Sequence, residues 1–246
     1  MRVEAFVVHL ERATARQPQV AEIARSIPLP TTVLAAVDAQ HLEPSARERL
    51  VRPRLHAPAY PFRLLDTEIA CFLSHRRAWQ TILDAGLDAG LIVEDDVAVA
   101  NPLFRRVLGH AIGRARPEDF IRFPLHERTE GRAPDRAEPS LIEPRLPGLG
   151  MQMQLVGHEA ARRLLAASEV FDRPVDSYVQ MQWIHGARMR SARPVVIREI
   201  DFVIGGSTVQ NKRAPLAQKA AHELGRPILR LAVRLANERW RRRGAA

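Results

Sequence analysis

Several common features are scarce in this chain, and each scarcity narrows what the protein can be. A single cysteine, Cys71, among 246 residues excludes a disulfide framework and a zinc site made of four cysteines. No stretch reaches the roughly 18 uncharged apolar residues that a membrane-spanning helix needs. Residues 1–4 lead straight into an apolar run, without the hydrophobic region of a secretory signal. We therefore expect a cytoplasmic protein that is soluble or peripheral at the inner face of the cytoplasmic membrane.

Lysine is almost absent, and the positive charge is unevenly spread. Two lysines accompany 35 arginines, and the net charge is +9. Residues 226–246 hold seven arginines and one glutamate, a net charge of +6, which leaves +3 on the other 225 residues. The basic character therefore belongs to the tail, and the body offers neither a basic face nor an aromatic platform. We expect no nucleic-acid partner.

An acidic triplet, Glu94-Asp95-Asp96, ends the apolar run over 90–93, which is typical of a buried strand. Three adjacent like charges at a strand end cost free energy through mutual repulsion and loss of hydration. A divalent cation would relieve that cost. In an open α/β sheet, the carboxyl ends of the strands are also where ligands bind. The alternative interpretation is a helix cap with solvated charges.

The hydrophobic pattern predicts alternating strands and helices. Hydrophobic residues make up 46% of the chain, enough for the core of one α/β domain. A strand over 3–9, a helix over 18–27 and a strand over 31–37 open the chain in the order of a parallel sheet. The further predictions are helices over 44–50, from 66 or 67 to 85, and over 102–115, 159–167, 175–185 and 227–243, strands over 90–93, 120–123, 151–156 and 194–200, a long loop over 124–150, and a turn at Gly205-Gly206-Ser207.

Four blocks of residues resemble glycosyltransferase family 25, the lipooligosaccharide-type glycosyltransferases. They lie at 7–12 (VVHLER) with Arg16, at 68–79 (EIACFLSHRRAW), at 91–96 (LIVEDD) and at 156–165 (VGHEAARRLL) followed by Pro174-Val175-Asp176. The blocks occur in the order of the family, and the second and third are specific in combination.

The resemblance implies a GT-A-like fold, a single-domain αβα sandwich with a mostly parallel central sheet. We assign it to residues 1–210, followed by a basic C-terminal helical tail over 211–246. The family transfers a sugar, often galactose, from a nucleotide-diphosphate donor such as a UDP-sugar to a glycan acceptor in lipopolysaccharide or cell-envelope polysaccharide synthesis. The resemblance further implies a divalent metal, Mn²⁺ or Mg²⁺, at the acidic triplet, and inversion at the anomeric carbon.

The acidic triplet carries the predicted metal site. Negative charge builds on the departing diphosphate, and Mg²⁺ or Mn²⁺ stabilises it as a Lewis acid. Such hard cations bind carboxylate oxygens and keep several waters, so one or two protein ligands suffice. In an extended triplet Glu94 and Asp96 point to one face and Asp95 to the other. We assign Glu94 and Asp96 to the metal, Asp96 also to catalysis, and Asp95 to the ribose or to support of the ligands.

Inversion needs a base that takes the proton of the acceptor hydroxyl. Asp176 is the candidate, because it opens a helix beyond the presumed acceptor strand; a plain helix N-cap after Pro174 is the alternative. Glu68 and His75 are weaker candidates for the base. They lie seven residues apart, two turns along one helix face, and with Ser74 they form either a support of the donor pocket or a buried polar network.

Other candidates for substrate binding follow the first strand. Arg12 and Arg16 lie where a nucleotide diphosphate would bind, since arginine pairs with phosphate in bidentate fashion. Solvation at the surface is the alternative for both. His9, at the strand end, would contact the base or ribose, or fill the core; the family commonly has asparagine there. Cys71 and Phe72 are expected in the core, as are Trp79 and Trp183 in preference to a sugar platform.

The chain departs from the family in two further places. It reads Gly150-Met151-Gln152-Met153-Gln154 where the family commonly has Gly-Thr-x-Gly-Tyr, and residues 205–209 lack an acidic residue often found there. We assign Gln154 to substrate binding. A shifted acceptor or a weakened enzyme would explain the departures, so the second functional hypothesis is a GT-A-like glycan- or nucleotide-sugar-binding module.

The tail, residues 226–246, supports a hypothesis of its own. A basic amphipathic helix with Trp240 can lie in the headgroup layer of an anionic leaflet, where lipid-linked glycan acceptors reside. A solvated, partly disordered tail is the alternative. Nucleic-acid binding through the tail ranks last, and phosphotransfer receivers or haloacid-dehalogenase-like phosphatases are disfavoured because neither predicts the block at 68–79.

Overall fold

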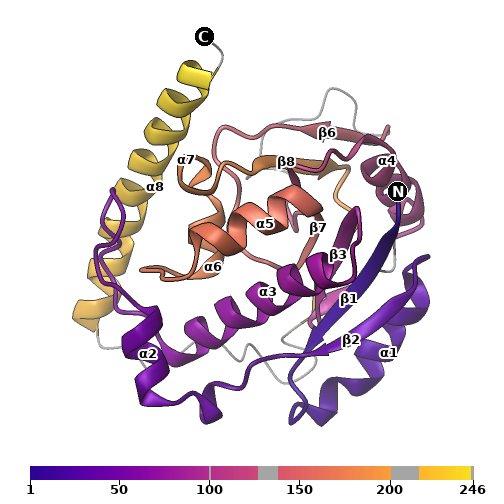
Figure 1. Ribbon diagram of the computed structural model, residues 1–246, viewed down its shortest axis with the longest axis horizontal. Coiled ribbons are helices and arrows are strands. Elements are labelled where there is room, and N and C mark those ends of the chain that lie inside the picture. The colour runs from indigo at the N-terminus through magenta and orange to yellow at the C-terminus, as the bar shows by residue number, and fades with distance from the viewer. Residues whose placement is uncertain (100, 127–137, 201–215, 245–246) are drawn as a thin grey trace.

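The computed structural model describes residues 1–99, 101–126, 138–200 and 216–244, with the side chains of 216–224 left out (Figure 1). Strands and helices alternate through most of the chain, as the hydrophobic pattern predicts. The helices are α1 (Gln17–Ser26), α2 (Pro44–Leu50), α3 (Asp66–Asp84), α4 (Phe104–Arg114), α5 (His158–Ala167), α6 (Val175–Val179), α7 (Gln182–His185) and α8 (Leu216–Gly244), with 3₁₀ turns at Thr14–Arg16 and Ala39–His41.

The described strands form one large sheet and one small one. The large sheet has the order β2 (Thr31–Ala35), β1 (Val3–His9), β3 (Ala89–Glu94), β7 (Met153–Gly157), β5 (Asp119–Arg122), β8 (Arg188–Arg193), β6 (Ser140–Ile142). Only β7 and β6 run against the other strands. The small sheet pairs β4 (Val97–Ala98) with β9 (Arg198–Glu199). The prediction of an α/β fold with a mostly parallel central sheet is therefore confirmed.

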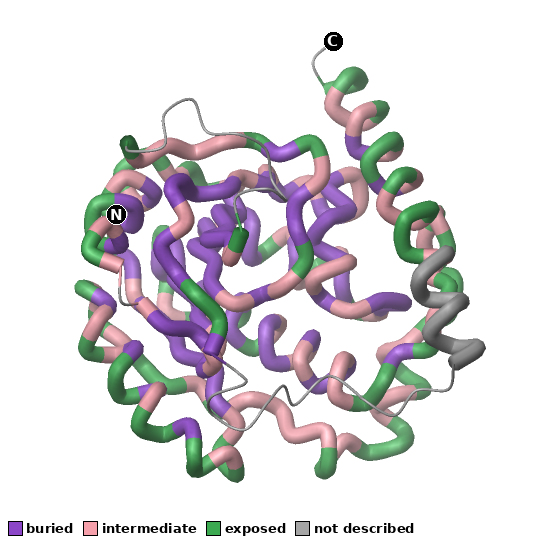
Figure 2. The backbone as a smooth tube through the Cα atoms, turned by 180° about the vertical axis from the view of Figure 1, so that it is seen from behind, coloured by how far each residue is buried: buried purple, intermediate pink, exposed green. Residues whose placement is uncertain are grey.

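Helices cover both faces of the large sheet, because successive side chains of a strand point to opposite faces. In β1, Phe6 and Val8 join the core that contains residues of α3 and α5, whereas Ala5 and Val7 join the core that contains residues of α1 and α4. Both cores are buried on the two sides of the sheet (Figure 2). The strands of the centre are thus apolar on both faces, which explains their near-continuous hydrophobic runs.

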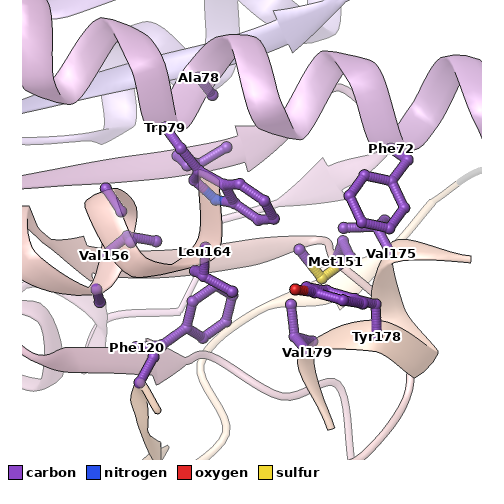
Figure 3. Close-up of a cluster of buried hydrophobic side chains, with 14 of the residues drawn as sticks. Phe72, Ala78, Trp79, Phe120, Met151, Val156, Leu164, Val175, Tyr178 and Val179 are labelled. Atoms are coloured by element: carbon purple, nitrogen blue, oxygen red, sulfur yellow. The ribbon is translucent and has the colours of Figure 1, made fainter. Parts of the chain in front are cut away.

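Helix α3 is the central support of one face. Its first turn is stabilised by Glu68, whose Oε2 accepts a hydrogen bond from the backbone N–H of Leu65 at 2.8 Å. Phe72 and Trp79 are completely buried. Figure 3 shows both rings pointing from α3 into a cluster that also receives Tyr178 from α6. The Phe72 ring lies 5.3 Å from that of Tyr178, so α3 and α6 are held together next to the site.

Two predicted elements were wrong. The helix expected over 175–185 is divided into α6 and α7, and the strand expected over 194–200 contains only the two residues of β9. The strand in that part of the large sheet is β8, which hydrophobic patterning missed because it carries three arginines. Nη1 of Arg190 forms an ion pair with Oδ2 of Asp119 on the neighbouring strand β5, at 3.0 Å, so a charged strand remains stable inside the sheet.

Smaller differences concern the loops and the tail. The predicted loop over 124–150 contains β6, and β4 was not predicted. Helix α8 starts before the predicted residue 227 and includes Pro227 within it. The predicted turn at Gly205-Gly206-Ser207 lies outside the described residues, and the division into residues 1–210 and 211–246 stays a prediction. None of the described helices combines the length and the apolar character that crossing a bilayer requires.

Candidate active site

A cavity of about 720 Å³ opens at the edge of the sheet where β1, β2, β3 and β5 end and β7 begins. Segments from α3, α6 and α8 complete its wall. Most of the predicted site residues line this cavity, although they come from four separate parts of the sequence. They are Arg12, Arg16, Glu68, Ser74, His75, Glu94, Asp95, Asp96 and Asp176.

Asp95 lies at the turn after β3 and points into the protein. Its Oδ2 is 2.7 Å from Nδ1 of His9, and its Oδ1 accepts a hydrogen bond from Nη1 of Arg16 at 2.6 Å. All three residues are buried. Asp95 therefore fixes the turn against the end of β1, and it brings Arg16 to the cavity wall with its charge already neutralised. His9 lies behind the wall, as the core alternative predicts; a contact between His9 and substrate stays a prediction.

Glu94, the last residue of β3, is oriented by two side chains behind it. His75 Nε2 is 3.0 Å from Glu94 Oε1, and Gln154 Nε2 is 3.2 Å from His75 Nδ1. Because an amide nitrogen can only donate, Nδ1 accepts, and Nε2 carries the hydrogen that His75 donates to Glu94. Gln154 and His75 are both buried. The buried polar network considered for His75 is thus present, and its end point is a proposed metal ligand.

Cys71 was expected in the core, but it is half-buried and lines the cavity. Its Sγ lies 3.9 Å from the same Oε1 of Glu94. Burial raises the pKa of the Cys71 thiol far above its usual range, and the carboxylates of Glu94, Asp176, Asp96 and Glu68 raise it further. The carboxylates of this part of the cavity therefore favour the neutral form of the Cys71 thiol.

Asp96 has an environment that would favour a bound cation. Its Oδ1 is buried and has no hydrogen-bond partner among the described residues. Burial raises the pKa of Asp96 to about 8, and the charges of Glu94, Asp95 and, to a smaller extent, Glu199 add to this effect. The charge of Arg16 lowers the pKa in part. A buried carboxylate oxygen without a hydrogen-bond partner is costly, and a divalent ion would remove that cost.

The donor set fits a hard divalent cation. Glu94 and Asp96 present carboxylate oxygens to the same cavity, and hard ions such as Mn²⁺ and Mg²⁺ prefer such oxygens with waters in the other positions. Glu199, a further carboxylate on the cavity wall, was missed by the sequence analysis. It reaches the site because β9 pairs with β4, where Glu199 lies opposite Val97.

Asp176 lies in the first turn of α6 and is held by backbone groups. Its Oδ2 accepts from the backbone N–H of Gly150 at 3.2 Å, and its Oδ1 accepts from that of Ser177 at 2.6 Å. The N-cap of α6 is Pro174 and not Asp176, so the plain N-cap alternative was wrong. The carboxylate lines the cavity, where the proposed base has to be.

Arg122, which the sequence analysis missed, stabilises the loop that holds Asp176. Its buried Nη2 donates to the backbone carbonyls of Leu149 and Gly150, both at 2.9 Å. Burial lowers the pKa of Arg122 to about 10, against the opposite effect of the Asp176 charge. Gly150 adopts a φ of +93°, a conformation that side chains rarely allow, so this loop has one specific shape.

The other candidates, Glu68, Ser74 and Arg12, also line the cavity. Burial raises the pKa of Glu68, and the nearby Asp176 charge adds to the effect. Ser74 donates to the carbonyl of Ala70 and accepts from the N–H of Val37, both at 2.8 Å, so it ties α3 to the segment after β2. Arg12 is half exposed, with its Nε 2.7 Å from Oδ2 of Asp38.

The basic helix α8 forms one wall of the cavity through Arg226, Leu229, Arg230 and Val233. The sequence analysis had placed these residues in a tail. Asn237 anchors the helix: its Nδ2 donates to the carbonyl of Gln180 at 2.8 Å, and its Oδ1 accepts from the N–H of Gln182 at 3.2 Å. The described part of α8 is thus packed on the body, beside α7 (Figure 1).

A cavity that contains several charged side chains at the carboxyl edge of a mostly parallel sheet is typical of a ligand-binding α/β protein. The sequence profile of glycosyltransferase family 25 (LPS biosynthesis protein) matches residues 2–132, more than half of the chain. The chain belongs to glycosyltransferase family 25.

Three curated relatives are similar to parts of the chain. Procollagen galactosyltransferase 1 of Danio rerio is 31% identical over 97 residues, 38% of this chain. Procollagen galactosyltransferase 2 of Homo sapiens is 25% identical over 143 residues, 56% of this chain. Inactive glycosyltransferase 25 family member 3 of Mus musculus is 26% identical over 223 residues, 78% of this chain. The chain spans 16%, 23% and 36% of the length of these relatives, respectively.

Proposed function

We propose that the protein is a metal-assisted glycosyltransferase that moves galactose or another hexose from a nucleotide-diphosphate donor, such as a UDP-sugar, to a glycan acceptor. The proposed acceptor belongs to lipopolysaccharide or cell-envelope polysaccharide synthesis, and the proposed outcome is inversion. The observation that carries this proposal is the Oδ1 of Asp96, which has no hydrogen-bond partner among the described residues, in a cavity that Glu94 and Asp176 also line. Membership of family 25 and the galactosyltransferase relatives support the choice of reaction.

The chain's own residues would divide the work as follows. Glu94 and Asp96 would hold Mn²⁺ or Mg²⁺, which when bound supplies Lewis-acid stabilisation of the departing diphosphate. His75 and Gln154 keep the Glu94 carboxylate in one orientation. Asp176 would accept the proton of the acceptor hydroxyl as that oxygen bonds to the anomeric carbon and the bond to the diphosphate breaks. The backbone N–H of Gly150 keeps the Asp176 carboxylate in place.

Sugar transfer with Mn²⁺ tests this division. Asp176→Asn and Asp96→Asn should each lower transfer at least about 100-fold, since each removes a group that acts on the reacting atoms. Asp96→Asn should also lose the response to Mn²⁺. Asp84→Asn, on the exposed end of α3, is the matched control and should transfer at the wild-type rate. Full activity in Asp96→Asn would exclude the proposed metal site.

A second candidate is a binding module that keeps the fold and has lost transfer. Two observations favour it: residues 150–154 depart from the family pattern, and one relative is named an inactive family member. Such a module would bind a nucleotide-sugar or a glycan with Mn²⁺ present and would release neither free sugar nor nucleotide. Product formation by the wild type that Asp96→Asn abolishes would rule it out.

We also propose that α8 contacts the anionic inner face of the cytoplasmic membrane and so meets a lipid-linked acceptor. Three apolar side chains of α8, Ile228, Leu231 and Leu235, are 70%, 58% and 44% exposed. At about 100° per residue they lie on one stripe, opposite the residues that line the cavity. One helix thus joins the cavity on one side to an apolar stripe on the other. Arginines at 239, 242 and 243 are exposed nearby and complement anionic headgroups.

Liposome sedimentation tests the membrane contact. The wild type should sediment with vesicles that contain anionic lipid and remain free of neutral vesicles, because arginine provides part of the attraction. The triple variant Ile228→Gln, Leu231→Gln, Leu235→Gln should lose sedimentation at unchanged helix content. If the stripe instead holds a second copy of the chain, the variant would change the oligomeric state and leave sedimentation as in the wild type, which would refute the proposal.

A further inference from the structure

The donor atoms of Cys71, His75 and Glu94 form a compact group beside the proposed Mn²⁺ site. The thiol sulfur, a ring nitrogen and a carboxylate oxygen all lie within 4.8 Å of one another. Among the described residues, no other set of three histidine, cysteine or acidic side chains is as close. Asp96 does not belong to this group, so the group shares only Glu94 with the pair assigned to Mn²⁺.

The distances suit a tetrahedral ion. Zinc bonds of about 2.3 Å to sulfur and about 2.0–2.2 Å to nitrogen and oxygen place neighbouring donors of a tetrahedron about 3.4–3.6 Å apart. Here Sγ of Cys71 is 3.9 Å and Nε2 of His75 is 3.0 Å from Oε1 of Glu94. For these two donor pairs, shifts of about 0.4 Å would therefore reach the tetrahedral spacing, and the third pair, Cys71 and His75, lies within 4.8 Å. Cys71 and Glu94 line the cavity, which leaves the fourth position open to water.

The donor types select the ion. Thiolate and imidazole favour Zn²⁺ and Co²⁺ over Mg²⁺ and Mn²⁺, which prefer oxygen. We propose that Cys71, His75 and Glu94 bind a thiophilic divalent cation, Zn²⁺ being the natural one, at a site separate from Asp96. The thiol releases its proton to water as the sulfur bonds to the ion.

Gln154 fits this site as the partner of the liganding histidine. In the structure its amide nitrogen donates to Nδ1 of His75 at 3.2 Å. When Nε2 binds the ion, Nδ1 carries the hydrogen, and Gln154 accepts it through Oε1 after its amide turns over. A metal-bound histidine commonly donates its other N–H to such an acceptor, and loss of the acceptor weakens binding about 10- to 100-fold.

The site has a consequence that rests on the proposed function. Glu94 belongs to both donor sets, so an ion on Cys71 and His75 draws Glu94 away from Asp96. Zn²⁺ should therefore inhibit transfer that depends on Mn²⁺. This inhibition would make the thiol of Cys71 a sensor of zinc at the donor cavity.

Cobalt spectroscopy on the metal-free full chain tests the site without any assay of transfer. One equivalent of Co²⁺ should give the near-ultraviolet band of a thiolate–cobalt bond and the visible bands of tetrahedral cobalt, and Zn²⁺ should displace both. Cys71→Ser should lose the near-ultraviolet band, and Gln154→Leu should weaken cobalt binding about 10- to 100-fold. Asp96→Asn, the matched control, should keep the bands at wild-type affinity. Circular dichroism confirms that each variant is folded.

Three results would overturn the proposal: no thiolate band in the wild type, a band that persists in Cys71→Ser, or a band that disappears in folded Asp96→Asn. The inhibition has its own readout, the ratio of transfer rates with and without Zn²⁺, which should be low in the wild type and close to one in Cys71→Ser. A chain that transfers no sugar but gives the predicted spectra would refute the proposed function and retain the zinc site.

Discussion

The pH dependence of stability in the metal-free protein tests the environment of Asp96. Burial and two neighbouring carboxylates raise the pKa of Asp96 from 3.8 to about 8. Between these values the unfolded chain has released the proton while the folded protein keeps it. Stability therefore falls as pH rises through this window, because the folded state binds more protons. The side chain of Asp96→Asn does not titrate, so the stability of this variant relative to the wild type should increase from pH 4 to pH 8 and stay constant above pH 8.

The size of this effect follows from the same pKa. At about 1.4 kcal/mol per pH unit, the interval from 3.8 to about 8 corresponds to at most about 6 kcal/mol. Asp96 lines the cavity, so water screens its charge, and about half of this, about 3 kcal/mol, is the expected change. A constant difference from the new amide adds to both ends of the profile and leaves the slope unchanged.

Urea unfolding in the presence of EDTA, at intervals from pH 5 to pH 9, measures the difference between Asp96→Asn and the wild type. The exposed Asp84→Asn provides the control, and its difference should stay constant with pH. Added Mn²⁺ should stabilise the wild type at pH 8 and leave Asp96→Asn unchanged. A flat difference between Asp96→Asn and the wild type would show that Asp96 is ordinarily ionised and solvated, and the argument for a cation would be lost.

Three further substitutions test the frame of the site. Gly157→Ala should destabilise the protein by about 2–3 kcal/mol in urea unfolding. The new Cβ would lie 2.4 Å from the backbone oxygen of Pro117, which cannot rotate away. An unchanged stability would contradict the packing of β7. Asp95→Asn should cost about 3–5 kcal/mol by leaving the buried Arg16 without its carboxylate, and a smaller loss than in Asp84→Asn would refute that role. Arg122→Leu should cost about 2–3 kcal/mol, since two carbonyls lose their donor, and it should lower transfer more than a stability-matched Gly157→Ala does.

The parts of the fold with regular hydrophobic spacing could be predicted from the sequence. The buried face of α3 repeats every three or four residues, and residues 5–8 of β1 and 89–93 of β3 are apolar, so local pattern and burial agree. Strand β8 could not be recognised, because Arg188 is paired with Glu143 and Arg190 with Asp119. These partners are far away in the sequence, and only the sheet brings them together.

The same reasoning applies to the site. The acidic triplet over 94–96 could be recognised from the sequence, because three adjacent carboxylates cost free energy that the local sequence does not offset. Arg122, Glu199 and the arginines of α8 have no such signal, because their roles arise from contacts with distant backbone or from a place on the cavity wall. Sequence spacing therefore located the acidic centre of the cavity, and tertiary structure was needed to find its supports.

The central claim is that a cation held by Glu94 and Asp96 binds a nucleotide in this cavity. Thermal unfolding with UDP, with and without Mn²⁺, tests it most directly, because a ligand at 100 times its Kd adds about 2.7 kcal/mol of stability. UDP should stabilise the wild type only when Mn²⁺ is present, and it should not stabilise Asp96→Asn under either condition. Equal stabilisation by UDP with and without Mn²⁺, or in wild type and Asp96→Asn alike, would contradict the account.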